Sequence, residues 1–222
     1  YDPTYLIIIP AIIFAMIAQA NVKSAFEKYS DIRNSRGLTG RDIARQILDA
    51  NGLYNVPIEH ISGSMTDHYD PKTNVVRLSD TVYDKTSIAA AGVAAHEVGH
   101  AIQHAVGYAP MALRSAIIPV TQFGSMAAFP LVILGLVLAF KPLITFGIIL
   151  YTAVVLFQAV TLPVEFNASR RALQSLEGGI LPPDENEQAK KVLTAAALTY
   201  VASMLSALLS LLRLIVLANR RK

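Results

Sequence analysis

Cysteine is absent from the 222 residues of this chain. Its absence excludes a disulfide framework and leaves no thiolate for metal binding. Any metal ion would therefore have to be held by histidine, aspartate or glutamate side chains. The sequence also contains no internal repeat and no low-complexity tract.

Hydrophobic residues make up 53% of the chain, and its mean hydropathy is +0.44. This composition is more apolar than that of an ordinary soluble domain and predicts a membrane protein. The net charge of +3 and the sequence pI near 9.1 could suggest nucleic-acid binding. However, the basic residues cluster beside apolar runs. Lys and Arg are enriched on the cytoplasmic side of transmembrane helices, which explains this clustering, so we expect no nucleic-acid partner.

Long apolar runs alternate with polar segments along the chain. About 20 apolar residues are needed to cross a bilayer as a helix. We expect one domain, residues 1–222, made of a transmembrane helix (5–22), a polar segment (23–114), a transmembrane hairpin (117–140 and 143–164), a second polar segment (165–192) and a last transmembrane helix (193–218).

The first apolar run has an alternative interpretation as a secretory signal, because Ala18-Gln19-Ala20 resembles a cleavage site. No basic residue precedes this run in the sequence, as such signals require, so we favour a membrane anchor.

Basic residues indicate the orientation of the chain. With four crossings, both polar segments lie on one side, and their basic residues predict that this side is the cytoplasm. These are Lys23, Lys28, Arg33, Arg36, Arg114, Arg170, Arg171, Lys190 and Lys191. The basic residues 220–222 conflict with this orientation. Either the last apolar run does not cross the membrane, or the larger number of basic residues in the two polar segments determines the orientation.

Local signals predict three elements in the first polar segment. Thr39 is a suitable N-cap for a helix that ends at Asp49, before Asn51-Gly52. Residues 67–71 have turn chemistry, and residues 74–78 form a short strand.

The sequence His96-Glu97-Val98-Gly99-His100 lies in an alanine-rich stretch that predicts a helix from Ser87 to Ala105. Histidines at positions i and i+4 project from one helical face and can bind one zinc ion together. Glu97 lies beside that face, where a carboxylate can act as general base towards water at the metal. Gly99 removes side-chain bulk beside the second histidine.

A catalytic zinc site needs a third protein ligand. His104 is excluded by distance, since eight residues correspond to ~12 Å of helical rise. Glu165 is the better candidate, because an acid at the end of a long apolar helix is costly unless it is bound. The alternative for Glu165 is an interfacial ion pair with Arg170 or Arg171.

These motifs resemble those of a known family. The sequence His-Glu-Val-Gly-His, followed after a hairpin by Glu165-Phe166-Asn167-Ala168-Ser169-Arg170, is similar to the YugP-like neutral zinc metallopeptidases and, more distantly, to the HtpX-like membrane proteases. In the latter, the third ligand is a Glu followed by Ala and Asp three and four positions on. Glu165 and Ala168 match, but Ser169 replaces the acid. The resemblance therefore implies that Glu165 is a ligand but does not carry over the role of that acid, and we expect Asn167 or Ser169 to orient a ligand histidine instead.

The resemblance also implies that residues 74–78 are an edge strand that pairs with an extended peptide. Asn74, Val75 and Val76 are therefore expected to contact a substrate, and His68, which precedes this strand, is a further candidate.

We therefore expect a mainly α membrane protein, with a transmembrane bundle and a small α+β zincin-like (gluzincin) domain. The expected function is that of a metalloendopeptidase with one Zn²⁺ per chain, held by His96, His100 and Glu165. Its substrates would be unfolded or membrane polypeptides, in membrane-protein quality control. The expected location is the bacterial plasma membrane, with the active site facing the cytoplasm. The alternatives are a non-catalytic metal-binding membrane scaffold and an intramembrane (site-2-like) protease.

Overall fold

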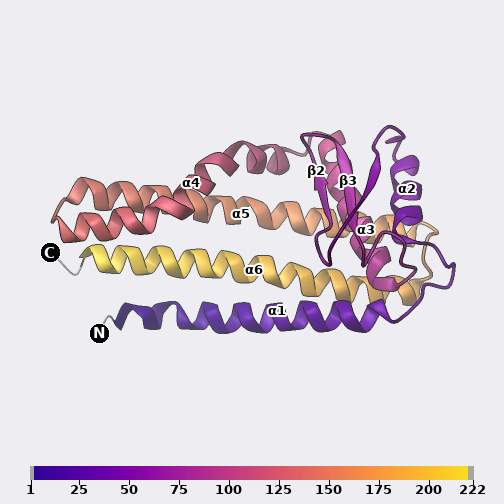
Figure 1. The fold of residues 1–222 in the computed structure, drawn as a ribbon, viewed down its shortest axis with the longest axis horizontal. Coiled ribbons are helices and arrows are strands. Elements are labelled where there is room, and N and C mark those ends of the chain that lie inside the picture. Colours follow the sequence, from indigo (N-terminus) through magenta and orange to yellow (C-terminus); the bar gives the residue numbers. More distant parts are fainter. Residues whose placement is uncertain (1–2, 220–222) are drawn as a thin grey trace. The chain divides into compact units, whose positions relative to one another are not determined.

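The computed structural model describes residues 3–219, which form mainly helices and one small sheet (Figure 1). In chain order the elements are η1 (Pro3–Ile7), α1 (Ile9–Ser30), α2 (Gly40–Ala50), β1 (Ile58–Ile61), β2 (His68–Asp70), β3 (Val75–Ser79), α3 (Ile88–Ala105), α4 (Ala109–Val137), α5 (Lys141–Glu177) and α6 (Pro183–Asn219).

The chain divides into two compact units. The apolar unit comprises Tyr1–Gln19, Ala109–Pro163 and Leu198–Lys222. The polar unit comprises Ala20–Tyr108 and Val164–Ala197. Both predicted polar segments thus contribute to the same unit.

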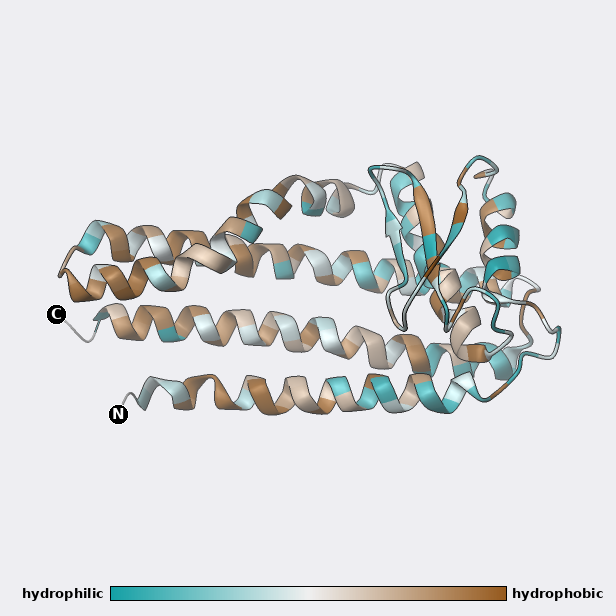
Figure 2. Ribbon diagram, viewed as in Figure 1, coloured by the Kyte–Doolittle hydropathy of each residue, from teal (hydrophilic) through white to brown (hydrophobic). Residues whose placement is uncertain are grey.

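Four helices are long and apolar enough to cross a membrane, namely α1, α4, α5 and α6. Figure 2 shows hydrophobic residues predominating along α4 and the first part of α5, whereas hydrophilic residues predominate along α2. These helices fit a membrane protein, as the composition predicts.

Within the apolar unit, α4 and α5 form the predicted hairpin through a tight turn at residues 138–140. A glycine allows their backbones to approach closely, since a Cβ at Gly147 would lie 2.8 Å from the carbonyl oxygen of Ala128. Val132 and Leu136 of α4 pack with Leu214 of α6 in a buried cluster.

The helices extend beyond the predicted transmembrane limits. α1 continues to Ser30, and α5 continues past Glu165 to Glu177. Apolar composition marks only the part of a helix that suits a lipid environment, while backbone hydrogen bonding carries the helix on through polar residues. The predicted loop between the last two runs is therefore confined to residues 178–182.

α2 begins and ends as its sequence predicts. The Thr39 hydroxyl accepts a hydrogen bond from the Asp42 amide, and Asp42 bonds back to the Thr39 amide, forming a capping box. The helix ends at Ala50, where Asn51 is the C-cap and Gly52 has a positive φ of 73°. α2 and α3 pack together, with Ile43, Ile47 and Leu48 of α2 buried.

The sheet corrects two sequence predictions. Its order is β1-β3-β2, with β3 parallel to β1 and antiparallel to β2. The prediction that residues 74–78 form an edge strand is wrong, because β3 is paired on both sides. The turn prediction for residues 67–71 is also wrong in part, since His68–Asp70 is strand β2. Strand pairing is a long-range property, and local turn residues do not reveal it.

α3 is the central helix of the polar unit. The Ser87 hydroxyl caps it by accepting a hydrogen bond from the Ala90 amide. The helix packs against α2, β2 and β3, and most of its side chains are buried. The predicted helix from Ser87 to Ala105 is confirmed.

Candidate metal centre

Two histidines project from one face of α3. The ring centroids of His96 and His100 are 4.8 Å apart, and the rings are nearly perpendicular at 85°. The i, i+4 spacing on a continuous helix produces this arrangement.

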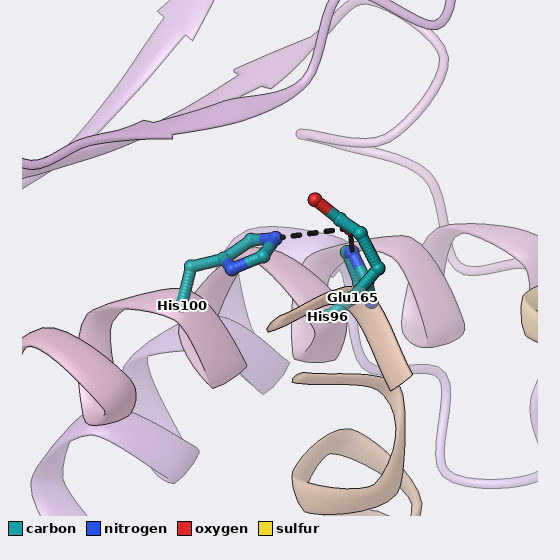
Figure 3. Close-up of side chains that lie close together, drawn as sticks. All are labelled: His96, His100 and Glu165. Carbon is teal, nitrogen blue, oxygen red and sulfur yellow. Dashed lines mark hydrogen bonds and ion pairs between the residues drawn. The ribbon is translucent and has the colours of Figure 1, made fainter. Parts of the chain in front are cut away.

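Glu165 of α5 completes a cluster with these histidines (Figure 3). Its Oε2 lies 3.2 Å from the Nε2 of His96 and 3.5 Å from the Nε2 of His100. Within residues 3–219, these three form the one group of histidine and acidic residues close enough to hold a metal ion, with ligand atoms within 4.8 Å of one another.

The separations of the Glu165 oxygen from the two histidine nitrogens match those of a zinc site. Ligand atoms at zinc bond lengths of about 2.0–2.1 Å in a tetrahedron lie about 3.3 Å apart. The two nitrogen-to-oxygen distances, 3.2 and 3.5 Å, bracket this value. The Glu165 side chain is only 2% exposed, and a buried carboxylate requires a compensating charge. The donor set of two imidazoles and one carboxylate therefore fits zinc.

Electrostatics around His100 favour a cation. Burial lowers its pKa, but the hydrogen bond to Glu165 and the negative charges of Glu97 and Glu165 outweigh burial, so the net pKa is raised. The site attracts positive charge, as a metal-binding pocket must.

A buried hydrogen-bond network orients His100. Gln103 is fully buried, and its Oε1 lies 3.0 Å from the Nδ1 of His100. Its Nε2 donates to the carbonyl oxygen of Val164 at 2.8 Å and to the Oδ1 of Asn167 at 3.0 Å. With Nε2 of His100 facing the cluster, Nδ1 carries the hydrogen and donates to Gln103.

Ser169 lies beside His96 as Gln103 lies beside His100, with its Oγ 3.1 Å from the Nδ1 of His96. Ser169 thus contacts a candidate ligand histidine directly, whereas Asn167 contacts one through Gln103. Asn167 also accepts a hydrogen bond from Arg171.

Gln103 was missed by the sequence analysis. It lies seven residues after His96, which is two helical turns, so it shares the face of the ligand histidines. A polar residue on the same face as the two histidines was the available signal.

Gly99 allows the two ligand-bearing helices to approach closely. A Cβ at this position would lie 2.6 Å from the carbonyl oxygen of Ala168 in α5. The group that needs the space left by Gly99 is thus the α5 backbone at Ala168.

Glu97 is buried beside the cluster and contacts the sheet. Its Oε2 accepts a hydrogen bond of 3.0 Å from the backbone amide of Tyr69 in β2. The outer edge of β2, opposite its pairing with β3, therefore faces Glu97.

The Tyr69 side chain connects β2 to the last turn of α3. Its hydroxyl lies 2.6 Å from both the Oδ1 of Asn74 and the Nδ1 of His104. Burial and the charge of Asp70 raise the pKa of Tyr69 to about 12, so the hydroxyl keeps its proton. His104 is outside the metal cluster, as predicted from its distance along the helix.

The predicted substrate residues are not part of this cluster. His68 is exposed, and its Nδ1 lies 2.9 Å from the carbonyl oxygen of Thr66. Val75 and Val76 have buried side chains in the central strand. Asn74 has a positive φ of 55° in the turn before β3.

Comparison with known proteins agrees with this geometry. A family model described as "Putative neutral zinc metallopeptidase" matches residues 4–219. The chain belongs to this family. Zinc is the metal that the family name implies, and the His96, His100 and Glu165 cluster is a fitting site for it.

A relative within this zinc metallopeptidase family is the "Putative membrane protease YugP" of Bacillus subtilis (strain 168). It is 52% identical over 201 residues, which cover 90% of this chain and 89% of the relative. The resemblance to the YugP-like family is therefore confirmed. No solved structure matches the chain significantly.

Proposed function

We propose that this chain is a membrane zinc endopeptidase that hydrolyses peptide bonds with Glu97 as general base. The observation that carries the proposal is the convergence of His96, His100 and Glu165 within 4.8 Å. These residues are proposed to hold one zinc ion per chain, in a zincin-like domain of the gluzincin type.

Zinc at this site would act as a Lewis acid, lowering the pKa of the attacking water molecule and polarising the substrate carbonyl. Glu97 then takes a proton from the attacking water as the new carbon–oxygen bond forms. The same carboxyl group delivers that proton to the amine nitrogen as the carbon–nitrogen bond breaks. The Tyr69 amide supports this role, because its hydrogen bond fixes the position of the Glu97 carboxylate.

The substrate is proposed to lie along β2 rather than β3. β3 has no free edge, whereas β2 is paired on one side only and its other edge faces Glu97. An extended peptide added to that edge would gain backbone hydrogen bonds with little sequence preference. His68 lies in β2 and remains a candidate for contact with a substrate side chain.

We further propose that the active site faces the cytoplasm of a bacterial plasma membrane, where the enzyme takes part in membrane-protein quality control. Both polar segments belong to one unit, as four membrane crossings require. The basic residues of these segments support the cytoplasmic side.

Substitution of Glu97 tests the proposal. Glu97→Gln keeps the three ligands, so purified protein should still contain about one zinc per chain. Cleavage of an unfolded reporter polypeptide should fall by about 10²–10⁴-fold, the usual contribution of a general base. Glu27→Gln, in an exposed residue paired with Lys23, is the matched control and should cleave normally.

The two rival functions give different results. A metal-binding scaffold would bind zinc but show no chelator-sensitive cleavage, even in the unsubstituted chain. An intramembrane protease would carry its histidines on a spanning helix, but α3 is not among the candidate spans in the described residues. Normal cleavage by the Glu97→Gln variant would refute the general-base role.

A further inference from the structure

A polar pocket lies within the apolar unit, among α1, α5 and α6. Its volume is about 350 Å³, within the usual range of ligand sites. The polar side chains that line it are Gln19, Tyr151, Gln158, Thr199, Ser203, Ser206 and Ser210.

These polar groups lie in helices that otherwise suit a lipid environment. Ser206 is near the middle of the apolar run 193–218, about 20 Å of helical rise from its start. Among residues 3–219, the side chains of Gln19, Gln158 and Ser206 make no hydrogen bond. An unsatisfied polar group is costly in hydrocarbon, so the pocket favours a polar occupant.

The lining defines the chemistry of that occupant. Carboxamide and hydroxyl groups each donate and accept hydrogen bonds, and none of the residues lining this pocket carries a formal charge. An ionised group would therefore lack a counter-charge, and a purely apolar group would leave the lining unsatisfied. An uncharged polar side chain, such as asparagine or glutamine, satisfies both requirements.

The surroundings indicate how such a side chain arrives. Exposed apolar residues on the same helices, including Met16, Leu156 and Leu208, would face lipid. Ala202 and Ala207, which are buried and have small side chains, form part of the pocket wall. An apolar helix that carries one polar residue matches both the pocket and its rim.

We propose that this pocket binds an uncharged polar side chain carried by a transmembrane helix of a substrate protein. This inference rests on the proposed function and gives it a substrate class, namely membrane proteins with polar residues inside their spanning helices. Such helices insert or assemble poorly, so recognising them would suit quality control.

The absence of native cysteine allows a direct test with single introduced thiols. The Glu97→Gln variant of the chain in lipid bilayers is mixed with two apolar 21-residue helices that differ only in a central asparagine or leucine. The asparagine helix should bind about three- to tenfold more tightly. This preference should disappear in a Gln158→Leu, Ser206→Ala double variant.

Disulfide trapping locates the contact. A thiol next to the central asparagine should crosslink to Ser206→Cys but not to Leu208→Cys, a matched control two residues away on the exposed face. Equal binding of both helices, or equal crosslinking at both positions, would overturn the proposal. A crosslinked pair of protein chains at Ser206→Cys that excludes the peptide would also overturn it, since the occupant would be a second copy.

Binding in this assay needs neither zinc nor cleavage. Failure of the proposed function would appear separately, as absence of zinc-dependent cleavage by the unsubstituted chain.

Discussion

Gln103 provides the sharpest test of how the site is built, because it contacts a candidate ligand and the neighbouring helix at once. Replacing it with leucine keeps side-chain bulk but removes three contacts, at 3.0 Å to His100, 2.8 Å to Val164 and 3.0 Å to Asn167. The variant leaves the Nδ1 hydrogen of His100 and the Val164 carbonyl without these partners in a fully buried position.

The expected loss follows from these contacts. A buried polar group left unpaired costs about 1–3 kcal/mol, so the unpaired His100 hydrogen alone should lower the free energy of unfolding by about 1–3 kcal/mol, and loss of the other two contacts adds to this. Partners that orient metal ligands are usually worth about 10–100-fold in metal affinity. Gln103→Leu should therefore weaken zinc binding by that factor.

A second substitution separates ligand orientation from general stability. Gln103→Glu keeps an acceptor for the His100 hydrogen but loses the amide donor to Val164 and Asn167. It should destabilise the fold, yet weaken zinc binding by less than about tenfold. The assays are thermal unfolding and zinc competition with a chelator of known affinity, with the exposed Gln46→Leu as control. Wild-type zinc affinity in Gln103→Leu would show that Gln103 is only structural.

Three further predictions concern the polar unit. Gly99→Ala should destabilise the chain by about 1–3 kcal/mol and reduce zinc content, because its Cβ would lie 2.6 Å from the Ala168 oxygen. Gly92→Ala on the same helix meets only a 3.6 Å contact and should be tolerated in the same unfolding and metal assays. Ser169→Ala removes the 3.1 Å contact to His96 and should lower zinc affinity by about tenfold in chelator competition. Hydrogen bonds from the side chains of Thr73 and Arg77 hold the pKa of Asp70 below its usual range. The stability they provide is therefore present above pH ~4 and lost below it, so Asp70→Asn should flatten the fall in Tm from pH 5 to 3.

Local sequence patterns predicted much of the structure. Helical spacing alone predicted the two histidines on one face of α3, and capping residues predicted the ends of α2. Glu165 needed one further argument, the cost of an acid in an apolar helix, and its Oε2 lies 3.2 Å from His96. Such features are determined by residues close together in sequence or by burial.

Features that depend on distant pairing could not be predicted in this way. The strand order β1-β3-β2 reverses the expected edge, because register and neighbours are set by packing over α3. Gln103 acquires its role only when residues 164–167 of α5 lie against α3. The same holds for Tyr69, whose amide reaches Glu97 across the fold.

The contacts between α3 and α5 have a consequence for metal binding. Gln103 bonds to residues 164 and 167, Gly99 lies against Ala168, and Ser169 contacts His96. All of these fall within six consecutive residues of α5, around Glu165. One helical step along α5 turns a side chain by about 100°, so this short contact fixes which residue faces the histidines. These contacts between α3 and α5 involve protein groups alone, so they hold the three candidate ligands in place before a metal binds. Zinc binding would then lose little free energy to ordering its ligands.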